Sequence, residues 1–189
     1  NRLLAIFDYK NDEMTIKQAN LQNVYLDGKF EGKIIFLPYF DFNLDLNLNS
    51  INFNRIYTSL INLDKEKKKD LFLINEKING KMSLFINKIY SKYSLIKSFE
   101  SRIKFINGNI SIDQLLFDLG KLGAADLSGI IKNDGKFTNF KFENNIFIDN
   151  LKRFYNKFGI YNKQNIPFNL FVSGNFDLVN LNMRLHEIS

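Results

Sequence analysis

Residues Arg102–Phe147 read RIKFINGNISIDQLLFDLGKLGAADLSGIIKNDGKFTNFKFENNIF and carry the clearest β pattern in the chain. Apolar runs alternate there with Asn-Gly and Asp-Gly pairs, which are strong hairpin signals because these residues tolerate the positive φ angles of tight turns. The pattern predicts four strands: Arg102–Ile106, Asn109–Phe117, Ala125–Lys132 and Lys136–Glu143. Turns are expected at Asn107-Gly108 and at Asn133-Asp134-Gly135. The stretch is therefore predicted to form an antiparallel meander.

The segment Phe40–Leu48 (FDFNLDLNL) has the most regular alternation in the chain. Its period of two predicts a strand with one apolar face and one wet face. The apolar positions are Phe40, Phe42, Leu44, Leu46 and Leu48. A calcium site on the polar face is not expected, since Asp41 and Asp45 would lie roughly 13 Å apart at about 3.3 Å per residue.

Two segments change to helical spacing, Asn52–Leu63 and Asn150–Gly159. Each directly follows a strand, begins at an Asn that can cap a helix, and predicts a short amphipathic helix. The intervening Asp64–Asp70 is expected to be a charged loop. The remaining predicted strands are Arg2–Tyr9, Met14–Lys17, Leu21–Leu26, Lys29–Leu37, Leu71–Ile74, Lys81–Ile89, Phe168–Ser173 and Asn175–Leu185.

A short phrase recurs along the chain: an apolar residue, Gly, a polar residue and another apolar residue. The glycines of these phrases are Gly28, Gly80, Gly108, Gly135 and Gly174. Each phrase is interpreted as a hairpin corner, and Gly108, Gly135 and Gly174 are expected to have positive φ. A hairpin cannot bury its apolar face alone, so the stacked hairpins are expected to share one long sheet.

The composition excludes several classes of function. The chain has no Cys and one His, so disulfide frameworks, Cys-based zinc sites and Cys nucleophiles are absent. No nucleotide-binding or nucleophile motif occurs, so neither catalysis nor a cofactor nor a metal site is expected. The net charge is +6, but the lysines are scattered, which does not favour nucleic-acid binding.

The chain resembles the AsmA-like family of bacterial envelope proteins. The phrases that carry the resemblance are LDGKFEG (Leu26–Gly32), INGKMSL (Ile78–Leu84), INGNISI (Ile106–Ile112), LSGIIKNDGKFTNFKFEN (Leu127–Asn144) and LNLNSINFNRI (Leu46–Ile56). The resemblance implies a mainly β fold, a long curled antiparallel sheet of repeated hairpins with about two short amphipathic helices and an apolar concave face. Residues 1–189 would form a single segment excised from a longer protein.

The resemblance also implies a function. It places the parent protein in the periplasm, anchored to the inner membrane by an N-terminal segment missing here, and associates it with phospholipid transport and outer-membrane biogenesis. The implied partners are phospholipids or other acyl-chain ligands, and other envelope proteins. The expected lipid-facing residues are Phe40, Phe42, Leu44, Leu46, Leu48, Ile110, Ile112, Ile130 and Phe140. Alternation alone leaves open whether this surface is a groove or the sealed core of a passive, adhesin-like scaffold.

Overall fold

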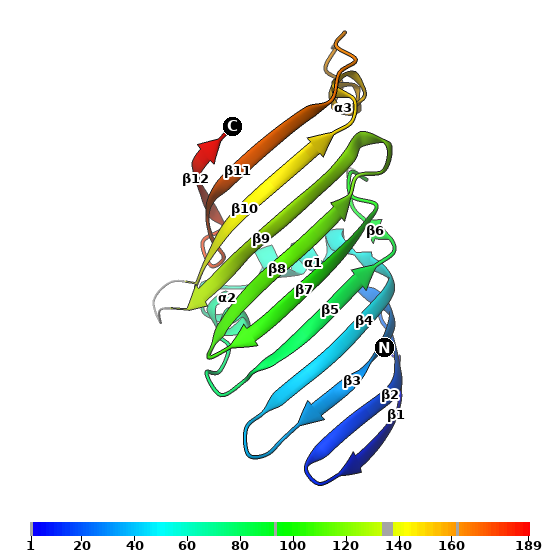
Figure 1. The fold of residues 1–189 in the computed structure, drawn as a ribbon, viewed down its shortest axis with the longest axis vertical. Coiled ribbons are helices and arrows are strands. Elements are labelled where there is room, and N and C mark those ends of the chain that lie inside the picture. Colours follow the sequence, from blue (N-terminus) through cyan, green and yellow to red (C-terminus); the bar gives the residue numbers. More distant parts are fainter. Residues whose placement is uncertain (1, 93, 134–137, 162) are drawn as a thin grey trace.

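The computed structural model describes residues 2–92, 94–133, 138–161 and 163–189. In this part of the chain twelve strands form one curled, unclosed sheet, accompanied by three α-helices (Figure 1). The strands are β1 (Arg2–Lys10), β2 (Glu13–Gln22), β3 (Leu26–Ile35), β4 (Asp41–Asn52), β5 (Gly80–Ile86), β6 (Ile89–Tyr90), β7 (Ser98–Ile106), β8 (Asn109–Asp118), β9 (Gly123–Asn133), β10 (Thr138–Ile148), β11 (Phe168–Asp177) and β12 (Asn182–Ile188). The helices are α1 (Phe53–Ile61), α2 (Lys65–Phe72) and α3 (Leu151–Lys157). The predicted mainly β fold is confirmed.

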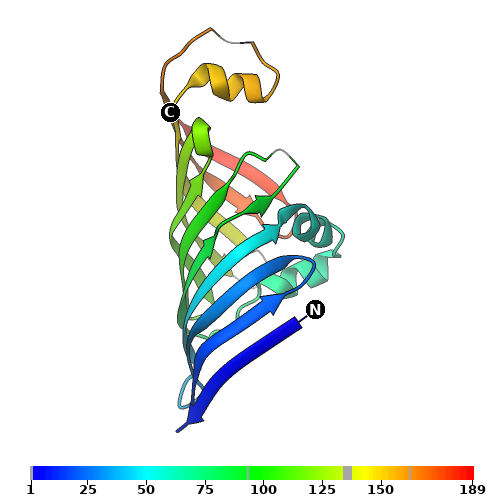
Figure 2. The same ribbon diagram turned by 90° about the vertical axis from the view of Figure 1, so that its right-hand side faces the viewer.

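The strands follow one another across the sheet almost in chain order, from β1 to β12. Neighbours on this path are antiparallel except β4 and β5, which are parallel, and the short β6 pairs in parallel with β4. Parallel neighbours need a crossover connection, and α1 and α2 supply it. They return the chain to the start of β4, where the backbone N–H of Asn79 donates to the Phe40 carbonyl (3.1 Å). Both helices lie on the side toward which the sheet curls (Figure 2).

The hairpin at Asn107-Gly108 is confirmed. Asn107 and Gly108 have φ angles of 49° and 78°, and they join β7 directly to β8. Two consecutive positive φ angles give the turn a twist that matches that of the flanking strands. The corner predicted at Asn133-Asp134-Gly135 lies largely outside the described residues.

Replacing Gly108 with Val should lower the free energy of unfolding by about 1–3 kcal/mol, because a β-branched residue is strained at a φ of +78°. The new Cβ would also stand 3.2 Å from the Ile74 carbonyl oxygen. Urea denaturation measures the change, with Ser111→Val in β8 as a control that tolerates a β-branched residue. Unchanged stability for Gly108→Val would mean that this corner does not require positive φ.

Three of the glycine phrases are not hairpin corners, and that prediction is wrong for them. Gly28 and Gly174 lie inside β3 and β11, and Gly80 opens β5 after a crossover. The positive φ expected at Gly174 is therefore also wrong. Each of these three glycines lies close against a neighbouring strand: a Cβ on Gly80 would stand 2.6 Å from the Phe42 ring, and one on Gly174 would stand 2.5 Å from the Arg184 carbonyl oxygen. A Cβ on Gly28 would stand 2.7 Å from a Leu48 methyl carbon. These glycines therefore make room for large side chains on one face of the sheet.

The corresponding turns are closed by polar side chains instead. The Asn23 carboxamide accepts from the backbone N–H groups of Tyr25 and Leu26 (2.8 and 3.0 Å), between β2 and β3. Asp177 accepts in the same way from Val179 and Asn180 (2.9 and 3.0 Å), between β11 and β12. Burial raises the pKa of Asp177, but a hydrogen bond from the Asn180 side chain, the two backbone hydrogen bonds and the charge of Lys65 outweigh it, so its pKa lies below the usual value. Asx turns thus replace glycine corners at these two hairpins.

The helix prediction is correct for α1 and α3. Asn52 and Asn150 cap them by accepting from the backbone N–H groups of Arg55 (3.1 Å) and Arg153 (2.9 Å). Helix α2 replaces the predicted charged loop Asp64–Asp70, and its last residues occupy part of the predicted strand Leu71–Ile74. Its cap is Asp64, which accepts from the Lys67 N–H (2.8 Å). Hydrophobic periodicity could not reveal α2, because its sequence KEKKKDLF is charged almost throughout.

Candidate functional site: the apolar face of the sheet

One face of the sheet carries apolar side chains from edge to edge. The register aligns a row of them across the strands, interrupted on β5 by Gly80: Tyr9, Met14, Ile34, Phe42, Phe105, Ile110, Ile131, Phe140, Phe176 and Met183. The Phe42 and Phe105 rings meet over Gly80, with centroids 5.2 Å apart. The next row holds Leu44, Met82, Ile103, Ile112 and Phe142. We call the face formed by these rows the apolar face and the opposite one the outer face.

The apolar face lies on the concave side of the sheet (Figure 2) and is partly buried along β4. Along β4, Phe42, Leu44 and Leu46 are partly exposed, whereas the alternate outer-face residues are exposed. Leu48, Ile51 and Ile86 form a buried cluster near the point where β4 leads into α1, and Ile16 and Phe142 are also buried on this face. In the described residues, α1 contacts β6, and α1 and α2 both lie on the concave side, where Figure 1 shows them behind β7 to β9. Phe42, Leu44 and Leu46 therefore keep only part of their surface exposed on this face.

Aromatic rings continue from this face along one margin of the sheet. Tyr9, Phe36, Phe40 and Phe42 are linked by successive ring contacts with centroids 6.1, 6.0 and 6.2 Å apart. The last of these rings contacts Phe105, so the contacts run from β1 to β7. Such tilted pairs contribute about 0.5–1.5 kcal/mol each beyond the area that they bury.

The structure brings most of the expected lipid-facing residues together. Seven lie on the apolar face: Phe42, Leu44, Leu46, Leu48, Ile110, Ile112 and Phe140. Leu48 is 6% exposed in the buried cluster and offers little surface to a ligand. Phe40 lies just before β4, bridged to Ile78 and in ring contact with Phe42. These residues span the sheet from β4 to β10.

The expected position of Ile130 on the apolar face is wrong. Ile130 pairs with Ser111 on one side and Lys141 on the other, which places it on the outer face. Its neighbour Ile131 occupies the apolar face, in register with Ile110 and Phe140. Two adjacent isoleucines carry no alternation, so the pairing partners decide which one faces inward.

Sequence reasoning missed Ile103, Phe105 and Phe142 as members of the apolar face. The Asn107-Gly108 turn could have placed Ile103 and Phe105, because it determines the register of β7 and β8. A two-residue turn pairs Ile106 with Asn109 and therefore Phe105 with Ile110, as observed. Phe142 could have been placed from its spacing of two residues from Phe140.

The outer face is polar and carries cross-strand ion pairs. Lys17 pairs with Asp8, Lys33 with Glu13, and Lys104 with Asp113, each at 2.6 Å. The hydrogen bond from Lys104 lowers the pKa of Asp113, against a smaller opposing effect of burial. Exposed pairs of this kind contribute about 0–1 kcal/mol each, so this face serves solubility and register more than stability.

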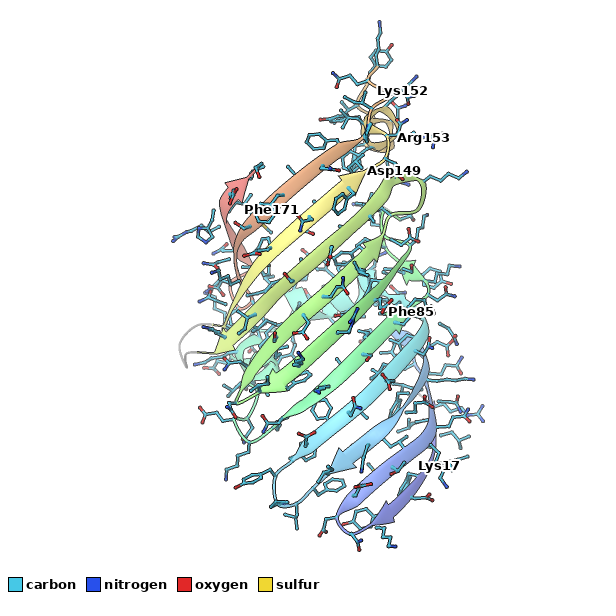
Figure 3. The ribbon with its side chains drawn as sticks, in the orientation of Figure 1. Lys17, Phe85, Asp149, Lys152, Arg153 and Phe171 are labelled. Atoms are coloured by element: carbon cyan, nitrogen blue, oxygen red, sulfur yellow. The ribbon has the colours of Figure 1, made fainter. Side chains whose placement is uncertain are left out.

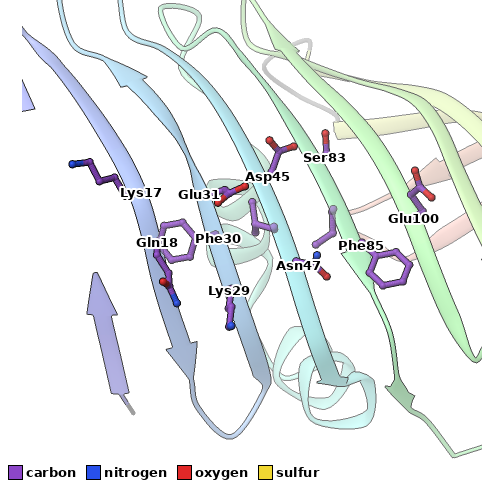
Figure 4. Close-up of a pocket in the computed structure, with 12 residues that line it drawn as sticks. Lys17, Gln18, Lys29, Phe30, Glu31, Asp45, Asn47, Ser83, Phe85 and Glu100 are labelled. Carbon is purple, nitrogen blue, oxygen red and sulfur yellow. The ribbon is translucent and has the colours of Figure 1, made fainter. Parts of the chain in front are cut away.

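A shallow hollow of about 460 Å³ crosses the outer face over β2 to β7 (Figure 4). Both signs of charge line it, with Lys17 and Lys29 beside Glu31, Asp45 and Glu100. Within the described residues, no group of three or more His, Asp or Glu side chains is arranged to hold a metal ion. No helix in that part of the chain has the length and apolar character needed to cross a membrane.

In comparisons with known protein families, curated proteins and solved structures, nothing matches this chain. Its chemistry must therefore be inferred from its own surfaces. The apolar face offers partly exposed hydrocarbon and aromatic side chains across the whole width of the sheet. Such a surface suits a long, flexible, apolar ligand better than a compact polar one.

Proposed function

We propose that the chain is part of an AsmA-like cell-envelope protein and that its apolar face binds the acyl chains of phospholipids in transit between the inner and outer membranes. The observation that carries this proposal is an apolar face that spans the sheet in continuous register yet stays partly exposed. A protein whose sheet served as a passive scaffold would gain stability by covering this face.

The dimensions suit acyl chains. Neighbouring strands lie about 4.8 Å apart, so ten steps across the sheet extend over roughly 48 Å. This length exceeds the bilayer hydrocarbon thickness of about 30 Å, so the face has room for more than one phospholipid. Each methylene group that leaves water gains about 0.8 kcal/mol, while the charged headgroup can remain in solvent beyond the strand ends.

In this proposal the protein binds and conducts lipid without catalysing a reaction and without a cofactor. It acts in the periplasm, held at the inner membrane by a segment outside this chain, and it contributes to outer-membrane biogenesis with other envelope proteins. The competing candidate is the passive scaffold. The buried cluster of Leu48, Ile51 and Ile86 favours that candidate locally, because it shows that part of the face is sealed.

Purification of the chain from a bacterial periplasm without detergent should yield bound phospholipid, identified by mass spectrometry of the extracted lipid. The purified chain should also bind a fluorescent fatty acid, and added phospholipid should displace this probe. Lipid-free protein that fails to bind the probe would contradict the proposal and favour the scaffold.

A further inference from the structure

The connection between β10 and β11 forms a separate projection from the end of the sheet. It holds α3 and a loop, and we call its described residues, 150–161 and 163–168, the tip. The tip extends beyond the strand ends, and Lys152 and Arg153 lie farther out than Asp149 (Figures 2 and 3). Backbone hydrogen bonds close its base, from Leu151 to Ile166 (3.0 Å) and from Lys152 to Gln164 (2.9 Å). The tip is therefore an ordered projection with a fixed base.

The tip has a charge of a single sign. It contains Lys152, Arg153, Lys157 and Lys163, and no Asp or Glu occurs between residues 150 and 168. All four cationic side chains are exposed, and no ion pair found among the described residues involves them. Elsewhere cations are mixed with carboxylates: Lys67 of α2 pairs with its own cap Asp64 at 3.1 Å.

Apolar side chains are exposed on the same projection. Phe158 is 47% exposed, Ile160 52%, Tyr161 77% and Ile166 51%. The Phe154 ring packs against Phe158, with centroids 5.2 Å apart, which holds this end of α3 in place. Cations next to exposed aromatic and aliphatic groups are typical of segments that lie in the interface of an anionic bilayer.

We infer that the tip docks on the surface of an anionic phospholipid bilayer. The four cations lie against lipid phosphates, and the exposed aromatic and aliphatic side chains enter the region between headgroups and acyl chains. Charge complementarity favours an anionic bilayer as the partner. The tip carries four cations and no carboxylate, so no part of it repels an anionic surface. The inference concerns a surface outside the apolar face and goes beyond the proposed function, which it would complement by bringing the sheet to a membrane.

The test uses the whole chain and vesicles of phosphatidylcholine with or without phosphatidylglycerol, in a sedimentation assay. The chain should sediment with the phosphatidylglycerol vesicles, and added salt should weaken this binding. The triple variant Lys152→Gln, Arg153→Gln, Lys157→Gln should bind roughly 100-fold more weakly, at about fivefold per cation. A matched control, Lys81→Gln, Lys132→Gln, Lys141→Gln, removes the same charge from the outer face and should bind as the parent chain does.

A second variant tests the apolar contribution. Ile160→Ser with Tyr161→Ser should reduce binding even at high salt, while circular dichroism and the urea midpoint stay unchanged. Equal losses in the tip variant and the control, or tighter binding to a single-stranded oligonucleotide than to vesicles, would overturn the inference. The proposed function is tested separately, since the tip variants should still co-purify with lipid on the apolar face.

Discussion

Replacing Ile86 with Asp is expected to unfold the sheet or leave it barely stable. Ile86 is 2% exposed and packs with Leu48 and Ile51, against Leu84 and Phe99. The substitution removes a buried aliphatic group and places an unpaired carboxylate in the same site, which we expect to cost about 4–5 kcal/mol. A domain of this size has a total stability of about 5–15 kcal/mol, so the loss leaves little stability at the lower end of that range.

The adjacent residue supplies a matched control. Phe85 points to the outer face and is 41% exposed, so a carboxylate there remains hydrated. Phe85→Asp should therefore lower the free energy of unfolding by only about 1–2 kcal/mol, through lost aromatic contacts and the charge of Glu100 on the neighbouring strand. Urea denaturation followed by circular dichroism measures both variants. Similar losses of unfolding free energy at the two positions would contradict the register, which buries Ile86 on one face of β5 and exposes Phe85 on the other.

The second large effect is expected on binding. Leu44 lies near the middle of the apolar face and is partly exposed, so we expect the carboxylate of Leu44→Asp to keep part of its contact with water. The protein should stay folded, with a loss of about 1–2 kcal/mol. An acyl chain, however, must now avoid or dehydrate the charge, and losing contact for three or four methylenes costs about 2–3 kcal/mol. Affinity for a fluorescent fatty acid should then fall roughly 30- to 150-fold.

Asn43→Asp is the control for this experiment, because it adds the same charge one residue away on the outer face. It should bind the probe as the parent chain does. If Leu44→Asp unfolds the protein, the face is a sealed core at this position. If it stays folded and binds the probe normally, β4 does not contact the ligand.

Local signals in the sequence predicted much of the fold. Strict alternation in Phe40–Leu48 gave both the strand and its inward face, because a period of two has one structural interpretation. The Asn107-Gly108 pair fixed a hairpin and its register. Asn52 and Asn150 marked the starts of α1 and α3, since each side chain caps the first turn within three residues.

The features that the sequence could not predict depend on neighbours far along the chain. Gly174 resembles a corner glycine, yet it lies inside β11, where a Cβ would stand 2.5 Å from the Arg184 carbonyl oxygen of β12 and 3.2 Å from the Phe142 ring of β10. Ile130 and Ile131 differ only in their cross-strand partners. The parallel pairing of β4 and β5 depends on a connection that contains α2. The charged sequence of α2 has no apolar stripe from which this helix could be predicted.

Lipid contact confined to one face is the most direct test of the proposed function. A photoreactive amino acid is placed in the parent protein in living cells, at Leu44 or Ile103 on the apolar face and at Asn43 or Arg102 on the outer face. After irradiation, mass spectrometry detects phospholipid attached to the protein. We expect adducts at Leu44 and Ile103 and none at Asn43 and Arg102. Adducts at all four positions, or at none of them, would contradict a lipid-binding role for the apolar face.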